Sequence, residues 1–183
     1  MQEKSEQFLV LVILLACGLV VYFNIFPFAL LAPGDTIVVD DRSKAIFAEL
    51  LKKADYTQPI TLEIFSFDEE QERMLAYAEY QQGHAVIRIS RYVLLAFDEH
   101  GKRGVLAHEI AHVVLGHIHY PREERSVNLN MLFDVEANVK AIQLIGKEEF
   151  RLFLVEAGLS DAAADRYIYD LEHAACHLPE TGQ

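Results

Sequence analysis

A strongly apolar segment that contains four histidines constrains the fold of this chain most. It reads "VLAHEIAHVVLGHIHY" and runs from Val105 to Tyr120. The density of aliphatic residues predicts a buried helix from Val105 to His119. Residues four apart lie on one face of an α-helix, so His108 and His112 point in the same direction, with Glu109 beside them. Two histidines on a buried helix require partners, either hydrogen-bonding groups of the core or a metal ion.

The order of these three residues favours the metal ion. In the pattern H-E-x-x-H, two imidazoles supply nitrogen ligands and the glutamate is within reach of a water molecule held by the metal. We therefore predict a Zn²⁺ site with His108 and His112 as ligands and Glu109 as the catalytic general base. Other divalent ions also accept nitrogen and oxygen ligands, so zinc is inferred from the ligand types.

The third ligand is not fixed by this helix. His119 lies seven residues beyond His112, which is about 10 Å along an intact helix and too far for one ion. In the longer pattern H-E-x-x-H-x-x-G-x-x-H, a bend at the glycine brings the last histidine to the metal. Here Gly116 and His119 each come one residue later than in that pattern, so the pattern is not matched. His117 points away from His108 on an intact helix, which predicts a structural hydrogen-bonding role.

The next predicted helix, Asn128 to Ile145, offers two acids, Asp134 and Glu136. Periodicity places Glu136 with lysines and a glutamine on a solvated face, and Asp134 with mostly apolar residues on a packed face. We predict that Asp134 is the third metal ligand; the alternative is a buried hydrogen-bonding acid. Asn138, one turn further, is a partner for a ligand histidine or for the backbone.

The N-terminus contains an apolar run, residues 8–32, that is interrupted by no charged residue. Its length of about 25 residues suffices for a helix across a bilayer core of ~30 Å. A cleaved signal peptide needs a basic start, which "MQEKSEQ" lacks, and a lipoprotein signal at "LLAC" is followed by too long an apolar stretch. We predict a single-pass membrane anchor in residues 1–32. Too few lysines and arginines flank it to fix the orientation; the extracytoplasmic side is favoured.

The rest of the chain, residues 33–183, is predicted to be one domain. The full chain has 183 residues and a net charge of −12, without clusters of lysine and arginine. Nucleic acid is therefore not an expected partner, because phosphate binding needs a basic face. The two cysteines, Cys17 and Cys176, cannot form a disulfide within this domain, and they do not indicate a compartment.

Hydrophobic periodicity predicts a small sheet beside several helices, which is an α+β domain. Alternating residues predict strands at 59–67 and 84–90, and "DEEQERMLAYAEYQQG" between them is ambiguous. Helical spacing predicts helices at 43–54, 91–97, 105–119, 128–145, 147–158 and 160–178, with a turn at 98–104. Ser43 and Ser160 are the expected N-caps of the first and last of these helices.

The segment "VLAHEIAHVVLGH" closely resembles the active-site helix of the membrane-associated zinc endopeptidases of the HtpX, CAAX-prenyl-protease and Oma type. The resemblance extends over roughly Ser43 to Gly146. It implies a zincin-like metallopeptidase domain and an E-x-x-A-D motif in the second helix. The matching residues here are "DVEAN", so Asp134 takes the ligand position and Asn138 replaces an aspartate. A similar asparagine occurs in the ImmA/IrrE-like metallopeptidases.

The resemblance also implies a substrate and an oxyanion-stabilising residue. The substrate is a protein or peptide that binds as an added strand along an edge strand at residues 84–90, which makes cleavage tolerant of sequence. A downstream histidine or arginine stabilises the oxyanion in this family. We predict His173 for this role, among the candidates Arg166, Tyr167, His173 and His177.

These residues predict a membrane-anchored zinc endopeptidase that hydrolyses membrane or envelope proteins. Two alternatives remain open. A catalytically impaired relative would bind metal or protein segments as a membrane-tethered module, because Asp134 is one methylene shorter than glutamate and Asn138 lacks a charge. A non-enzymatic interaction domain, in which the histidines only pack, would bind no metal.

Overall fold

The computed structural model describes residues 38–65, 75–121 and 124–175. The predicted membrane anchor, residues 1–32, lies outside these ranges, as do Cys17, Cys176 and His177. Within the described ranges, none of the helices has both the length and the apolar character needed to cross a membrane. All of the described residues belong to the predicted domain of residues 33–183, and the anchor stays a prediction.

The described strands form one three-stranded sheet in the order β1-β3-β2. The strands are β1 (Ile60–Phe65), β2 (Ala76–Gln81) and β3 (His84–Ser90). β1 pairs with β3 in parallel and β2 pairs with β3 in antiparallel. A two-residue turn joins β2 to β3, with positive φ at Gln82 and Gly83, as a type I′ hairpin requires.

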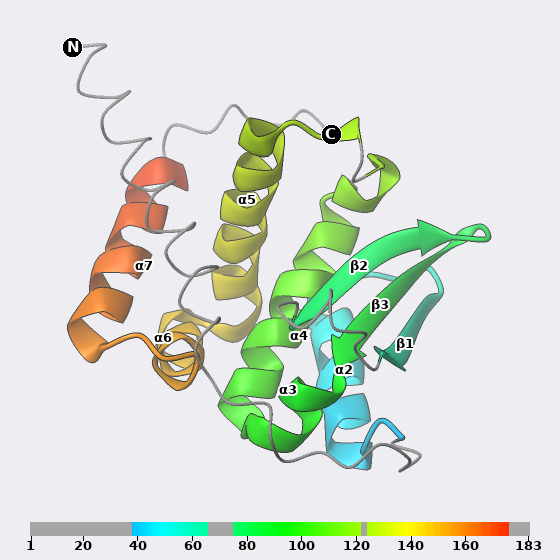
Figure 1. The fold of residues 1–183 in the computed structure, drawn as a ribbon, viewed down its shortest axis with the longest axis horizontal. Helices are drawn as coiled ribbons and strands as arrows, with labels where there is room; N and C mark the ends of the chain where they lie inside the picture. The colour runs from blue at the N-terminus through cyan, green and yellow to red at the C-terminus, as the bar shows by residue number, and fades with distance from the viewer. Residues whose placement is uncertain (1–37, 66–74, 122–123, 176–183) are drawn as a thin grey trace.

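This topology corrects the prediction that residues 84–90 are an edge strand. β3 is the central strand, and both of its edges are occupied by β1 and β2. A substrate strand therefore cannot pair with its backbone. Among the described strands, β2 has an outer edge that pairs with no other strand and lies near the helices (Figure 1). The sequence left this segment ambiguous.

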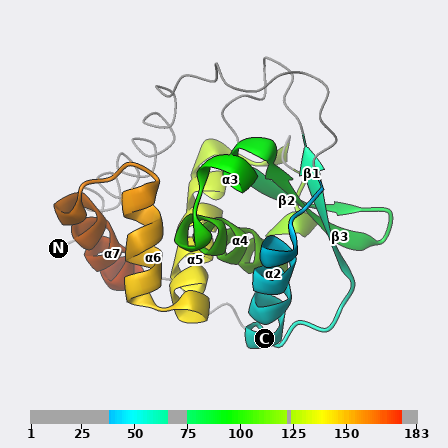
Figure 2. The ribbon, with the colours of Figure 1, turned by 90° about the horizontal axis from the view of Figure 1, so that it is seen from below.

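Six α-helices accompany the sheet in the described part of the chain, which confirms the α+β class. They are α2 (Asp41–Lys53), α3 (Arg91–Ala96), α4 (Glu99–Val114), α5 (Val127–Ile145), α6 (Lys147–Glu156) and α7 (Asp161–Ala175), with a short 3₁₀ helix η2 (His117–His119). α4 lies in the middle of the domain, with the sheet and α2 on one side and α5, α6 and α7 on the other (Figures 1 and 2).

The bounds of α4 differ from the predicted helix at both ends. Asp98 caps the N-terminus by accepting hydrogen bonds from the backbone of His100 and Gly101, so the predicted turn at 98–104 is the start of the helix. The helix ends at Val114, and Gly116 follows in the left-handed region with φ 74°. The chain therefore turns before His117, and the predicted continuation to His119 is wrong. Likewise, Asp40 rather than Ser43 caps α2.

Buried aliphatic and aromatic residues of α2, α4, α6, α7 and the sheet form one continuous core. α4 and α6 approach each other closely at Gly104, where an added Cβ would lie 2.1 Å from Cγ of Phe153. Glycine is therefore required at this crossing. The core fixes α4 against its neighbours and thus fixes the direction in which His108 and His112 point.

Candidate metal centre

His108, His112 and Asp134 converge on one point between α4 and α5. One ligand atom from each of the three side chains lies within 4.8 Å of the others. Nε2 of His108 is 3.0 Å from Nε2 of His112, and this second nitrogen is 3.5 Å from Oδ1 of Asp134. The structure thus brings together the three residues that were predicted as metal ligands.

The chemistry of this group fits a zinc ion. Two imidazole nitrogens and one carboxylate oxygen are a ligand set that catalytic zinc sites use, with a further position left for water. Both histidines present Nε2 to the shared point, while each Nδ1 faces a hydrogen-bonding partner elsewhere. His108, His112 and Asp134 are therefore the residues that would hold the ion.

Glu109 belongs to the same site as the candidate ligands. Its side chain is only 6% exposed, and it lines a cleft of about 270 Å³ together with His112 and Asp134. The other lining residues come from β2, η2, the loop after it and the start of α5: Ala78, His117, Ile118, Arg125 and Asn130. A substrate in this cleft would lie beside both the glutamate and the ligand group.

His108 is held in place by Asn138, which is one of the two roles that the sequence left open for this residue. Nδ1 of His108 is 2.8 Å from Oδ1 of Asn138, and the amide of Asn138 donates to the hydroxyl of Tyr167 on α7 at 2.8 Å. Burial lowers the pKa of His108 and raises the pKa of Tyr167. Both groups are therefore neutral partners of the amide at pH 7.

His112 is held by a different set of residues. Its Nδ1 is 2.9 Å from Nδ1 of His117, and Nε2 of His117 is 3.0 Å from Oε2 of Glu136. Burial lowers the pKa of His117 to about 3, and burial raises the pKa of Glu136. His117 is thus the structural hydrogen-bonder that the sequence predicted, although it contacts a ligand histidine directly.

The structure corrects the predicted faces of α5. The side chain of Glu136 is only 15% exposed, against His117, whereas that of Asp134 is 49% exposed at the cleft. Glu136 was predicted to be solvated because lysines share its side of the helix. The turn at Gly116 places η2 over that side instead, which the sequence pattern of α5 alone does not indicate.

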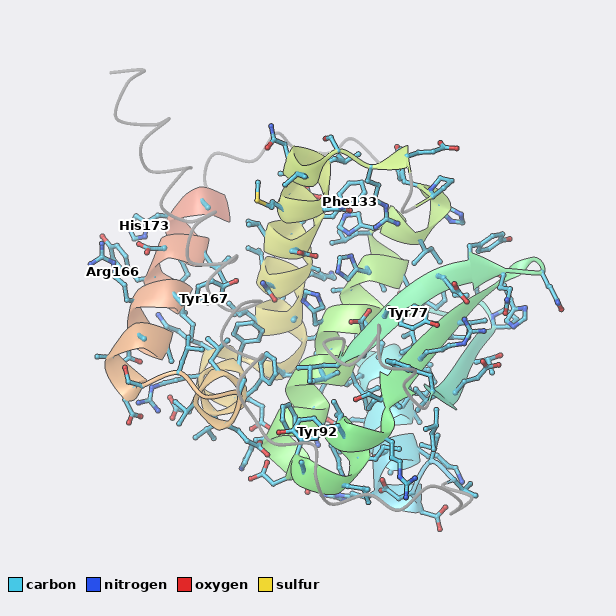
Figure 3. All side chains as sticks on the ribbon, in the orientation of Figure 1. Tyr77, Tyr92, Phe133, Arg166, Tyr167 and His173 are labelled. Carbon is cyan, nitrogen blue, oxygen red and sulfur yellow. The ribbon has the colours of Figure 1, made fainter. Side chains whose placement is uncertain are left out.

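The ligand group is not reached by three other residues that the sequence raised: His119, which was already disfavoured as a ligand, and the oxyanion candidates His173 and Arg166. His119 is exposed on η2 and its ring contacts Tyr80, with centroids 4.8 Å apart. His173 and Arg166 lie on the side of α7 that faces away from α5 (Figure 3), and Nδ1 of His173 contacts the carbonyl of Tyr169. The prediction that His173 stabilises the oxyanion therefore does not agree with this arrangement. Tyr167 is the described candidate that points toward α5 (Figure 3).

Sequence reasoning missed Arg125 and the partnership of His117 with Glu136. Arg125 donates to the carbonyls of His117 and Tyr120, and its guanidinium lies 5.4 Å from the ring centroid of Phe133. It thereby connects the residues just before α5 to η2 and Tyr120. The five-residue separation of His112 and His117 can be read from the sequence. It brings the two rings into contact only because the chain bends at Gly116.

A comparison with protein families identifies the family of this chain. The family model described as Peptidase family M48 matches residues 39–167, which is more than half of the chain. The matched region includes all three ligand residues, Glu109 and Tyr167. The match does not separate the HtpX, CAAX-prenyl-protease and Oma types. Neither a curated protein nor a solved structure matches the chain.

Proposed function

The chain belongs to peptidase family M48, and on this premise we propose that it is a zinc-dependent endopeptidase. We further propose that residues 8–32 anchor it in a membrane and that it cleaves membrane or envelope proteins. The observation that carries the proposal is the group of His108, His112 and Asp134 within 4.8 Å of one another, beside the carboxylate of Glu109 in the same cleft.

The residues of the cleft have separate roles in this reaction. Zinc, when bound by His108, His112 and Asp134, supplies a Lewis acid that activates water for attack on a peptide carbonyl. The carboxylate of Glu109 accepts the proton of the attacking water and then donates it to the nitrogen of the leaving amine. Glu109 is well placed for this because it is almost fully buried yet lines the cleft.

The substrate is proposed to pair with the open edge of β2. The N–H of Ser90 donates to the carbonyl of Leu75, so these two residues form a hydrogen-bonded pair of the antiparallel ladder. Such pairs alternate along a ladder, which leaves the backbone groups of Ala76, Ala78 and Tyr80 directed away from β3. Ala78 also lines the cleft. An extended peptide on this edge would present its backbone to the cleft with little regard to sequence.

The proposed activity is tested by a single substitution in the full-length chain. Zinc-loaded protein in mild detergent is incubated with an unfolded protein such as casein, and fragments are followed by mass spectrometry. We expect Glu109→Gln to reduce cleavage about 10²- to 10⁴-fold, the usual contribution of a general base. Glu149→Gln is the matched control, because Glu149 contacts His100 near the other end of α4. Cleavage that survives Glu109→Gln contradicts the mechanism.

A second candidate function is a metal-loaded binding module without turnover. The observation that favours it is Asp134, whose short side chain is 49% exposed at the cleft where the family motif has glutamate. The same experiment separates the two functions. Zinc binding with no cleavage that depends on Glu109 would support the binding module.

The position of the substrate is tested by Ala78→Pro. Proline removes the N–H that points to the open edge, and an edge strand tolerates it because the ladder to β3 does not use this group. We expect KM for the unfolded protein to rise about tenfold, as one backbone hydrogen bond is lost, with zinc content unchanged. Ala78→Ser, which keeps the N–H, is the control. An unchanged KM would contradict binding along β2.

A further inference from the structure

A largely buried series of three hydrogen-bonded side chains extends from His112 in the candidate metal centre to Glu136 on α5. Its members are His112, His117 and Glu136, with 2.9 Å between the two Nδ1 atoms and 3.0 Å from His117 Nε2 to Glu136 Oε2. His117 is 3% exposed, and its ring is stacked on Phe133 at 4.0 Å and 8°. Every ring nitrogen of this series except the Nε2 that faces the ligand group is thus directed at another member.

Metal binding gives this series one direction of hydrogen bonding. A histidine that binds a metal through Nε2 carries its remaining proton on Nδ1. Nδ1–H of His112 then donates to Nδ1 of His117, which must accept with its lone pair. The proton of a neutral His117 is consequently on Nε2, where it donates to the carboxylate of Glu136.

We propose that His117 and Glu136 are positioning residues that fix the tautomer of His112 and increase its strength as a ligand. The inference rests on the proposed zinc site. A carboxylate behind a ligand histidine usually acts on it directly; here the second imidazole extends its reach from α5 across η2 to α4. The series of hydrogen bonds from His112 through His117 ends at the negative charge of Glu136. This charge stabilises the positive charge that His112 acquires when it binds a cation.

The two ligand histidines therefore receive unequal support. His108 donates to the neutral amide of Asn138, which itself donates to Tyr167. His112 is connected through His117 to the carboxylate of Glu136. Loss of the carboxylate should thus weaken the metal site through His112 while leaving the support of His108 intact.

The experiment measures zinc affinity of the full-length chain by competition with a chromophoric chelator. The variants are His117→Phe, which keeps an aromatic ring against Phe133, and Glu136→Gln, which keeps a hydrogen-bond acceptor and removes the charge. His100→Phe and Glu149→Gln are matched controls, because His100 Nδ1 is also 3.0 Å from its glutamate oxygen. We expect about 10- to 100-fold weaker zinc binding for His117→Phe and about tenfold for Glu136→Gln, as for other partners of ligand histidines, with no change in the controls.

A second measurement separates this role from simple packing. In zinc-loaded chain labelled with ¹⁵N-histidine, the Nδ1 proton of His112 should be protected from exchange with water, and His117→Phe should remove this protection. If His117→Phe changes neither the zinc affinity nor the exchange rate of the His112 Nδ1 proton, the positioning role of His117 and Glu136 is overturned, while the proposed function is not. Wild-type chain that binds no zinc would instead overturn the proposed function.

Discussion

Two histidine–glutamate pairs near opposite ends of α4 have the same contact distance, but the pKa of the histidine is shifted in opposite directions. His117 and Glu136 are 3.0 Å apart, with side chains 4% and 15% exposed. His100 and Glu149 are also 3.0 Å apart, but their side chains are 44% and 22% exposed. Burial lowers the pKa of His117 to about 3, whereas the hydrogen bond to Glu149 raises the pKa of His100.

The difference shows that burial decides what such a pair can do. In water, the charged imidazole is well solvated and the carboxylate adds to its stability, so the pair is an ion pair of small energy. Away from water, desolvation opposes the charged imidazole, so a neutral ring remains as a directed hydrogen-bond donor and acceptor. Only the buried pair is therefore suited to orient a metal ligand.

The largest expected contrast is in the free energy of unfolding. His117→Ala removes a buried ring and leaves Nδ1 of His112 and the carboxylate of Glu136 without their partner, which should cost about 3 kcal/mol. His100→Ala should cost no more than about 0.5 kcal/mol, because solvent screens an exposed pair. Chemical denaturation of the metal-free chain measures both values. Equal losses would show that the two pairs do not differ in the proposed way.

Between the two pairs, Gly104 allows a test of whether the ends of α4 are independent. An alanine Cβ there would lie 2.1 Å from Cγ of Phe153, so Gly104→Ala should destabilise the fold by about 2 kcal/mol despite the better helix propensity of alanine. Phe153→Leu in the same chain should recover part of this loss. Zinc affinity of the variant should remain that of the wild type at temperatures where it is folded; a parallel loss of zinc affinity would indicate coupling along the helix.

The smallest expected effect is the pH dependence contributed by His100. Its pKa is raised in the folded chain by Glu149, so the folded state binds its proton more tightly than the unfolded state. The resulting stabilisation is complete below the unfolded pKa of about 6.5 and is lost as pH rises through the higher folded value. His100→Gln should flatten the unfolding free energy over this window. If the slope of the unfolding free energy against pH is the same in His100→Gln as in the wild type, the ion pair of His100 and Glu149 is contradicted.

Local spacing was sufficient to predict which three side chains, those of His108, His112 and Asp134, come together. The four-residue separation of His108 and His112 determines their common face, because helix geometry is nearly invariant. Asp134 was chosen because periodicity placed it on a packed face; it reaches the group although its side chain is 49% exposed. Of the two roles left open for Asn138, one turn further, the structure shows the contact with a candidate ligand histidine. These residues lie close together because short helical segments and one turn relate them.

Relations that depend on long-range packing could not be predicted in the same way. β2 carries alanines at its buried positions 76 and 78, and small side chains give a weak hydrophobic alternation. The solvated role predicted for Glu136 failed because the left-handed Gly116 folds η2 back over α5. His173 was chosen on the resemblance alone, and the resemblance does not determine which face of α7 meets the rest of the domain.

The central claim is that His108, His112 and Asp134 hold one zinc ion, and its most direct test is the zinc content of the full-length chain. Wild-type protein, Asp134→Ala and Glu149→Ala are purified in parallel, exposed to equal zinc, desalted and measured by plasma emission spectroscopy. The account predicts one zinc per chain in the wild type and in Glu149→Ala, and none in Asp134→Ala. Absence of zinc from the wild type, or its retention in Asp134→Ala, would contradict the proposed site.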